Sequence, residues 1–166
     1  MNFEQFHLPG FLLRDLYKES LVELNEIHQI PEKPADLKTN VLGNNQQQVL
    51  ILVNYPGQLV ITDPDLSFLQ TILLACNLSL NDVAIFNMSV AGEVNYQSLI
   101  ESFKPKVILL FGVQQSGINL PVHFPDYQVQ SFKDIRFLSA PTLIELQEEK
   151  SIKLKLWAGL KKIFLP

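Results

Sequence analysis

The sequence predicts an α/β protein with three α/β/α layers, in which helices cover both faces of a central, mostly parallel sheet of about four strands. Two observations lead to this prediction. Short apolar runs, as expected for strands buried on both faces, alternate along the chain with segments of helical periodicity. The connections between these segments are short, as in successive β-α-β units. Hydrophobic residues make up 47% of the 166 residues, which supplies enough apolar material for one buried core.

The chain is expected to form a single domain over residues 1–166, with an N-terminal part (1–47) and an α/β core (48–166). Apolar residues recur at three- and four-residue steps over residues 11–30, which predicts an amphipathic helix. Residues 31–48 carry two prolines, a Gly-Asn-Asn sequence and a glutamine run, which predict a linker.

The core elements follow in order. The apolar run Val49–Val53 predicts a strand covered on both faces. A helix follows, with Asp63 as its N-cap and Pro64 at its first position, and ends near Asn77. The remaining predicted elements are a strand at Val83–Phe86, a helix at Tyr96–Phe103, a strand at Val107–Phe111, a fourth strand within Tyr127–Phe132, and a long helix from Pro141 to about Ile163.

Composition narrows the classes of function. The net charge of −4 is unlike that of a dedicated nucleic-acid binder, so any contact with DNA is expected to be weak and salt-dependent. The single cysteine, Cys76, lies in an apolar helical run and is expected to be a buried structural thiol. The three histidines have no partner at metal-ligand spacing, so neither a metal nor a cofactor is expected. With no signal-peptide pattern and no apolar run near the roughly 20 residues of a membrane span, a cytoplasmic location without membrane contact is expected.

A candidate site is expected at the carboxyl end of the first core strand, where α/β proteins usually hold their ligands. The segment Asn54-Tyr55-Pro56-Gly57 leaves this strand in a Pro-Gly turn, and Asn87 ends the next strand. The loop Val113–Gly117 offers further polar groups, although an ordinary loop explains it equally well. No phosphate-binding loop or dinucleotide glycine pattern follows the first strand.

These motifs, in this order, resemble the uracil-DNA glycosylase superfamily. Its thermostable members have a strand ending in Gly-Glu-Ala-Pro-Gly, a strand ending near an Asn, a "KPKVILLFG" strand, and His-Pro-Ser before a helix with Lys and Trp. The counterparts here are Val53–Gly57, Asp82–Asn87, Lys104–Gly112 and Ala140-Pro141-Thr142, followed by Lys150 and Trp157.

The resemblance implies a glycosylase-like fold whose chemistry has been lost. Asn54 stands where the thermostable members have an acid, and Tyr55 where other branches have Asp or Asn. Ala140 replaces the histidine that stabilises the departing uracil anion, and alanine cannot donate that hydrogen bond. The single cysteine excludes the iron–sulfur cluster of the thermostable members.

A second resemblance is consistent with the loss of the glycosylase acid and histidine. The helix start Leu59-Val60-Ile61-Thr62-Asp63-Pro64, the stretch Ala140–Leu146 and the pair Leu156-Trp157 are similar to the psi-subunit family of the bacterial DNA polymerase III clamp-loader complex. This resemblance implies a non-catalytic protein-interaction subunit that acts in DNA replication as a clamp-loader adaptor, without a cofactor. Its partners would be the clamp loader or the single-strand-binding machinery. Residues 1–40 show no match to that family's clamp-loader-binding peptide.

Two surfaces are candidates for partner contact. Phe3 and Phe6 precede the N-terminal helix, although docking on the domain explains aromatic residues equally well. Residues 150–162 of the last predicted helix carry a lysine cluster and no acid, which also fits a solvated face; the cluster includes Lys150, Lys153, Lys161 and Lys162.

The alternative to the adaptor hypothesis is an enzyme, either a divergent uracil-DNA glycosylase-like repair enzyme or another hydrolase that uses the same cleft. Its candidate residues are Asn54, Asn87 and Ser139. A third possibility is an orphan domain with an unrelated role.

Overall fold

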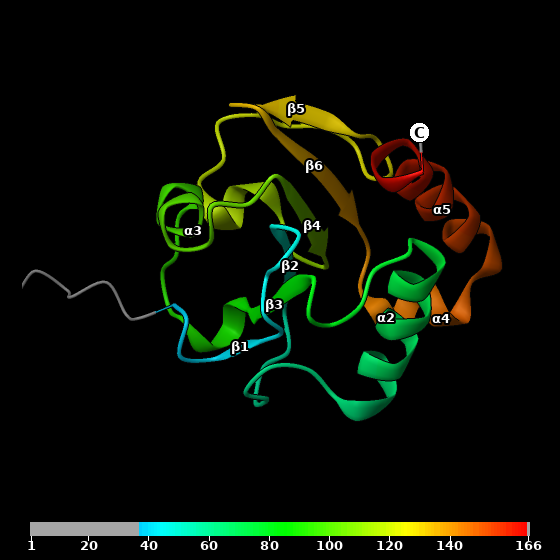
Figure 1. Ribbon diagram of the computed structural model, residues 1–166, viewed down its shortest axis with the longest axis horizontal. Coiled ribbons are helices and arrows are strands. Elements are labelled where there is room, and N and C mark those ends of the chain that lie inside the picture. Colours follow the sequence, from blue (N-terminus) through cyan, green and yellow to red (C-terminus); the bar gives the residue numbers. More distant parts are fainter. Residues whose placement is uncertain (1–36, 166) are drawn as a thin grey trace, which may run out of the picture. The chain divides into compact units, whose positions relative to one another are not determined.

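A six-stranded sheet forms the centre of residues 37–165, the part of the chain that this computed structural model describes (Figure 1). In spatial order the strands are β1 (Val41–Leu42), β3 (Val83–Asn87), β2 (Val49–Val53), β4 (Val107–Phe111), β6 (Ile135–Ala140) and β5 (Gln130–Phe132). The four central strands run parallel, and one short antiparallel strand closes each edge. The sheet is therefore mixed, and the prediction of a mostly parallel sheet of about four strands is wrong.

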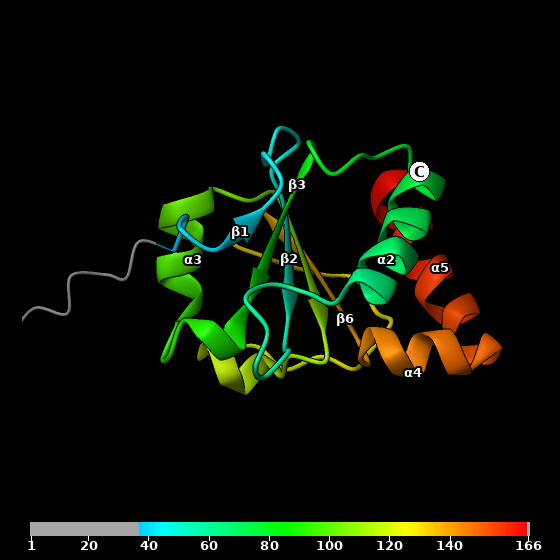
Figure 2. The same cartoon turned by 90° about the horizontal axis from the view of Figure 1, so that it is seen from below.

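Helices cover both faces of this sheet. Figure 2 shows α3 (Tyr96–Phe103) on one side and α2 (Asp63–Ala75), α4 (Leu143–Glu148) and α5 (Lys150–Phe164) on the other. Two short 3₁₀ turns, Met88–Val90 and Gln115–Ile118, follow β3 and β4. The bounds predicted for β2, β4 and α3 are confirmed.

The central strands are apolar throughout because both of their faces are covered. Every residue of β2, β3 and β4 is buried. In β2, Ile51 packs into the core under α2, α4 and α5, whereas Leu50 and Leu52 pack into the core under α3. Successive side chains of a strand point to opposite faces, so a continuous apolar run supplies both cores.

The chain changes direction across the sheet between β2 and β4. The connection from β2 through α2 leads to β3 on one side of β2, and the connection through α3 returns to β4 on the other side. These two helices lie on opposite faces (Figure 2). The carboxyl ends of β2 and β4 therefore form a topological switch point, the usual position of a ligand site in an open α/β sheet.

Two predicted helix boundaries are wrong. The N-cap of α2 is Thr62 rather than Asp63, and Pro64 is the second helical residue. The C-terminal segment is two helices, because Glu149 is extended (φ −118°, ψ 113°) between α4 and α5. Thr142 and Glu145 form a capping box that starts α4.

Three strands depart from the prediction. β1 lies inside the predicted linker, and β6, the fourth parallel strand, was not predicted. Only Gln130–Phe132 of the segment predicted as the fourth strand is extended, and it pairs antiparallel to β6 at the edge. The two are joined by Lys133 and Asp134, which both have positive φ (51° and 62°). Such turns usually contain Asn or Gly, so the Lys-Asp pair is only a weak signal for a hairpin.

None of the helices in residues 37–165 has the length and the apolar character that a membrane span requires. The helix predicted at 11–30 and the two aromatic residues Phe3 and Phe6 lie outside the described residues.

Candidate functional site

The amide of Asn87 holds the loop that follows β2. Its Oδ1 accepts hydrogen bonds from the backbone N–H of Tyr55 at 2.9 Å and of Ser89 at 3.1 Å. Its Nδ2 donates to the carbonyl oxygens of Tyr55 at 2.8 Å and Gln58 at 2.9 Å. With two bonds to its oxygen and two from its nitrogen, the buried amide has no hydrogen-bonding capacity left for a ligand.

Asn54 stands at the surface beside this loop. Its side chain is exposed, and its Oδ1 accepts a hydrogen bond from the Ser89 hydroxyl. The turn residues Pro56 and Gly57 are also exposed, and Gly57 has the positive φ (81°) that such a turn needs. The segment therefore lies at the carboxyl edge of the sheet, but its polar groups hold the turn together.

A buried carboxylate lies behind the same loop. Asp65, in the first turn of α2, accepts hydrogen bonds from Thr62 Oγ1 at 2.8 Å and from Gln147 Nε2 of α4 at 2.5 Å. The buried Tyr55 hydroxyl faces this carboxylate but makes no hydrogen bond of normal geometry. Burial and the neighbouring negative charge raise the pKa of Tyr55, so its phenol stays neutral. Burial alone would raise the pKa of Asp65, but its polar contacts with Tyr55, Thr62 and Gln147 outweigh burial and lower it.

A pocket of about 410 Å³ opens farther along the same edge, beside the ends of β4 and β6. Ser139 and Ala140 line it, whereas Asn54, Tyr55, Pro56, Gly57 and Asn87 do not. The predicted site residues therefore fall into two groups. Asn54, Tyr55, Pro56 and Gly57 form the loop after β2 that Asn87 holds, whereas Ser139 and Ala140 line a pocket two strands away. The remaining lining residues come from the loop after β4 and from the segment before β5: Gly112, Val113, Gln114, Gln115, Ser116, His123, Phe124, Pro125 and Asp126.

The polar groups of this pocket are partly engaged with one another. Ser139 Oγ donates to Asp126 Oδ1 at 2.7 Å, and Gln115 Nε2 donates to the Phe124 carbonyl at 2.9 Å. His123 also lines the pocket, but within residues 37–165 no hydrogen bond joins it to Ser139 or Asp126. A serine nucleophile is normally activated by a base such as histidine within hydrogen-bonding reach. The arrangement can hold a polar ligand, but it is not an assembled catalytic dyad.

Of these pocket residues, Asp126 and His123 were not predicted as members of a site. The loop Val113–Gly117 was recognised as a source of polar groups, and its first four residues line the pocket together with Gly112. Asp126 is exposed and stands in a Phe-Pro-Asp loop, which has no distinctive motif. Only the parallel pairing of β6 with β4 brings this loop to the pocket.

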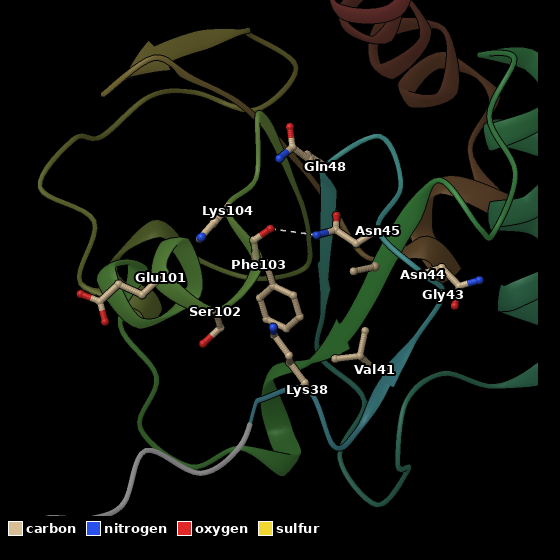
Figure 3. A pocket seen from close by; sticks show the side chains of 11 residues that line it. Lys38, Val41, Gly43, Asn44, Asn45, Gln48, Glu101, Ser102, Phe103 and Lys104 are labelled. Carbon is tan, nitrogen blue, oxygen red and sulfur yellow. Dashed lines mark hydrogen bonds between the residues drawn. The ribbon is translucent and has the colours of Figure 1, made fainter.

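A second pocket, of about 580 Å³, lies beside the amino ends of β2 and β3 and the C-terminal end of α3 (Figure 3). Figure 3 shows the Asn45 side chain directed at the Phe103 carbonyl at the end of α3, to which its Nδ2 donates at 2.8 Å. The Asn45 Oδ1 is buried and accepts no hydrogen bond within the described part of the chain. Ligand sites of open α/β sheets lie at the opposite, carboxyl edge, so this hollow is not the primary candidate.

The lysine cluster belongs to α5. Lys153 Nζ lies 5.5 Å from the ring centroid of Phe68 on α2, and Lys161 Nζ lies 5.6 Å from that of Trp157. Lys150 and Lys162 are exposed on the same helix. Two of these lysines are therefore placed over aromatic rings rather than spread on a uniformly solvated face.

Cys76 and the metal-binding groups offer no further site in residues 37–165. Cys76 is buried as predicted, and burial raises the pKa of its thiol, which keeps it protonated and unreactive. No group of three or more His, Cys, Asp or Glu side chains in this range could hold a metal ion.

Comparison of the sequence with protein-family models and with curated proteins found no match in either case.

Proposed function

We propose that this chain is a non-catalytic protein-interaction subunit that resembles the psi subunit of bacterial DNA polymerase III and acts in DNA replication as a clamp-loader adaptor. The proposal that the protein is non-catalytic rests on the hydrogen bonding of the Asn87 side chain. In a glycosylase-like site the end of β3 would face the substrate. In this protein the Asn87 amide forms all of its hydrogen bonds with backbone groups of Tyr55, Gln58 and Ser89.

The other edge residues support the same proposal. Ala140 is buried at the end of β6 and has no side-chain donor for a leaving base. Asn54, the counterpart of the glycosylase acid, accepts a hydrogen bond from Ser89. The phenol of Tyr55 is held neutral against Asp65 and cannot act as a base.

The adaptor part rests on the sequence resemblance, and two local features support it. The Thr62-Asp63-Pro64 motif starts α2 shortly after the loop that Asn87 holds. The Leu156-Trp157 pair lies on α5, where Leu156 is buried and Trp157 is half-buried. We propose the glycosylase-like relation of the fold on the same basis, with β3, β2, β4 and β6 as its parallel strands.

The experiment for the adaptor role is co-elution of the full-length protein with the purified clamp loader of its own host during size-exclusion chromatography. A shift of the protein into the clamp-loader peak supports the proposal. Separate elution at concentrations above those in the cell would overturn it.

The second candidate is a divergent uracil-DNA glycosylase-like enzyme, and the polar pocket beside Ser139 favours it. Its volume of about 410 Å³ falls in the range of small-molecule sites. A uracil-excision assay on single-stranded DNA, with a uracil-free strand as control, tests this candidate. Excision that is lost in both Asn54→Ala and Ser139→Ala would establish an enzyme and reject the non-catalytic proposal.

A further inference from the structure

An apolar groove runs between α2 and α5 on the face of the domain away from α3. Its cavity is about 200 Å³ in volume. The α2 wall is uncharged, and the α5 wall combines apolar side chains with one lysine. The lining residues are Phe68, Thr71, Ile72 and Ala75 from α2, and Lys153, Leu156, Trp157 and Leu160 from α5.

Each of the two helices that form this groove also carries a large apolar side chain that is exposed. Leu74 of α2 is 70% exposed and Leu154 of α5 is 61% exposed. Leu154 is followed by Trp157 at a three-residue step, so the two share one face of α5. Large apolar side chains that gather on a surface beside a groove are typical of a binding site for another protein.

The charged side chains of α5 itself have one sign. Lys150, Leu154, Trp157 and Lys161 follow steps of four, three and four residues, so both lysines lie on the face of α5 that carries Leu154 and Trp157. Lys153 reaches across to Phe68 of α2. The segment Lys150–Phe164 contains no acidic residue that would neutralise these lysines.

We propose that this groove binds an acidic amphipathic helix of a partner protein, with its apolar side chains on the groove and its carboxylates against Lys150, Lys153 and Lys161. The groove has the form that helix-in-groove recognition uses, an apolar trough between two helices. Its charge selects an acidic helix over a basic one. This inference uses only the groove, so it holds or fails independently of the clamp-loader assignment.

Protein is favoured over nucleic acid for two reasons. The cavity is lined by aliphatic and aromatic side chains and offers few hydrogen-bonding groups to a sugar or phosphate. The chain as a whole carries a net charge of −4, which repels a polyanion beyond the local lysines.

The test measures binding of the full-length protein to a synthetic helical peptide with Glu on one face and Leu and Phe on the other, by fluorescence anisotropy at low salt. A peptide of the same composition with a scrambled order is the control for the helical pattern. Saturable binding of the patterned peptide, at least about tenfold tighter than that of the scrambled one, is expected.

Two neighbouring lysines supply matched variants. Lys161 and Lys162 both lie in the last turn of α5, so replacing either by Glu has the same effect on the helix dipole and the net charge. Lys162 follows Lys153 by about two and a half helical turns and faces away from the groove. Lys161→Glu is expected to weaken peptide binding about fivefold, whereas Lys162→Glu is expected to change it by less than about twofold.

Thr71→Glu tests the groove itself, because Thr71 is exposed and its replacement places a longer, negatively charged side chain in the trough without disturbing the core. This variant is expected to abolish binding of the acidic peptide while its thermal unfolding stays close to that of the parent. Equal effects of Lys161→Glu and Lys162→Glu, or unchanged binding by a folded Thr71→Glu, would overturn the proposal.

Three other outcomes would also overturn it, each in favour of a different occupant. Displacement of the peptide by a single-stranded oligonucleotide would indicate a nucleic-acid site. Dimerisation of the free protein that Thr71→Glu abolishes would indicate a second copy. Protection of the groove from hydroxyl-radical labelling in the free monomer would indicate that the chain covers the groove itself.

Discussion

Asn87 encloses the peptide backbone of Tyr55 from both sides. Its Nδ2 donates to the Tyr55 carbonyl oxygen at 2.8 Å, and its Oδ1 accepts from the Tyr55 N–H at 2.9 Å. One buried side chain at the end of β3 thus fixes the loop at the end of β2, the neighbouring strand. These hydrogen bonds give the Asn87 amide a structural role at the carboxyl edge of the sheet, where other α/β proteins bind their ligands.

Asn87→Ala is expected to destabilise the protein by about 2–4 kcal/mol, because it removes four hydrogen bonds and leaves buried backbone groups without partners. Urea unfolding measures the change. Asn44→Ala is the matched control, because it deletes one exposed bond to Asn81 and is expected to cost less than about 0.5 kcal/mol. Equal costs for the two variants would contradict the structural role of Asn87.

Gly43 is expected to tolerate no side chain. Its φ is +104°, and an added Cβ would lie 2.2 Å from the Val83 carbonyl oxygen and 2.5 Å from that of Leu80. Both obstacles are backbone atoms, so Gly43→Ala is expected to cost more than about 3 kcal/mol in the free energy of unfolding. Gly57 has a similar φ (+81°) but open space around it, so Gly57→Ala isolates the cost of the backbone conformation, about 1 kcal/mol.

Asp65 is expected to make the stability depend on acid pH. Its folded-state pKa is lowered, so its contribution is fully present above the ordinary value of 3.8 and is lost as the pH falls through the lowered pKa. Asp65→Asn should therefore reduce the loss of stability between neutral and acid pH, measured by urea unfolding at a series of pH values. Asp63→Asn removes an exposed carboxylate from the same helical turn and controls for the loss of charge.

Thr142→Ala is expected to destabilise α4 by about 1 kcal/mol, because the Thr142 hydroxyl accepts the hydrogen bond of the Glu145 N–H in the capping box. Thr142→Ser keeps this hydroxyl and should recover most of the loss in thermal unfolding. A serine variant as unstable as the alanine variant would show instead that the methyl group, which packs over Gly112, supplies the stability.

The structure places the residues of the predicted site at one edge of the sheet but in two separate groups. The parallel arrangement of β2, β3 and β4 places Asn54 and Asn87 at one carboxyl edge, as their positions after apolar runs predicted. The polar pocket instead gathers Ser139, Asp126 and His123, because β6 pairs with β4. The strand β6 was missed because Ile135–Ala140 contains Arg136 and Ser139 and follows a hairpin turn without Gly or Asn.

The sequence by itself determined the two central strands β2 and β4 and the helix α3. Val49–Val53 and Val107–Phe111 are strands because an apolar run of that length is stable only between two covered faces, and Tyr96–Phe103 is a helix that Asn95 caps and Pro105 follows. The tertiary structure alone decided how the polar groups are used. A buried amide such as Asn87 must satisfy its hydrogen bonds with whatever lies beside it, and its neighbours come from a loop 32 residues earlier in the chain. The same holds for the groove between α2 and α5, whose walls are far apart in sequence and meet only because both helices pack on one face of the sheet.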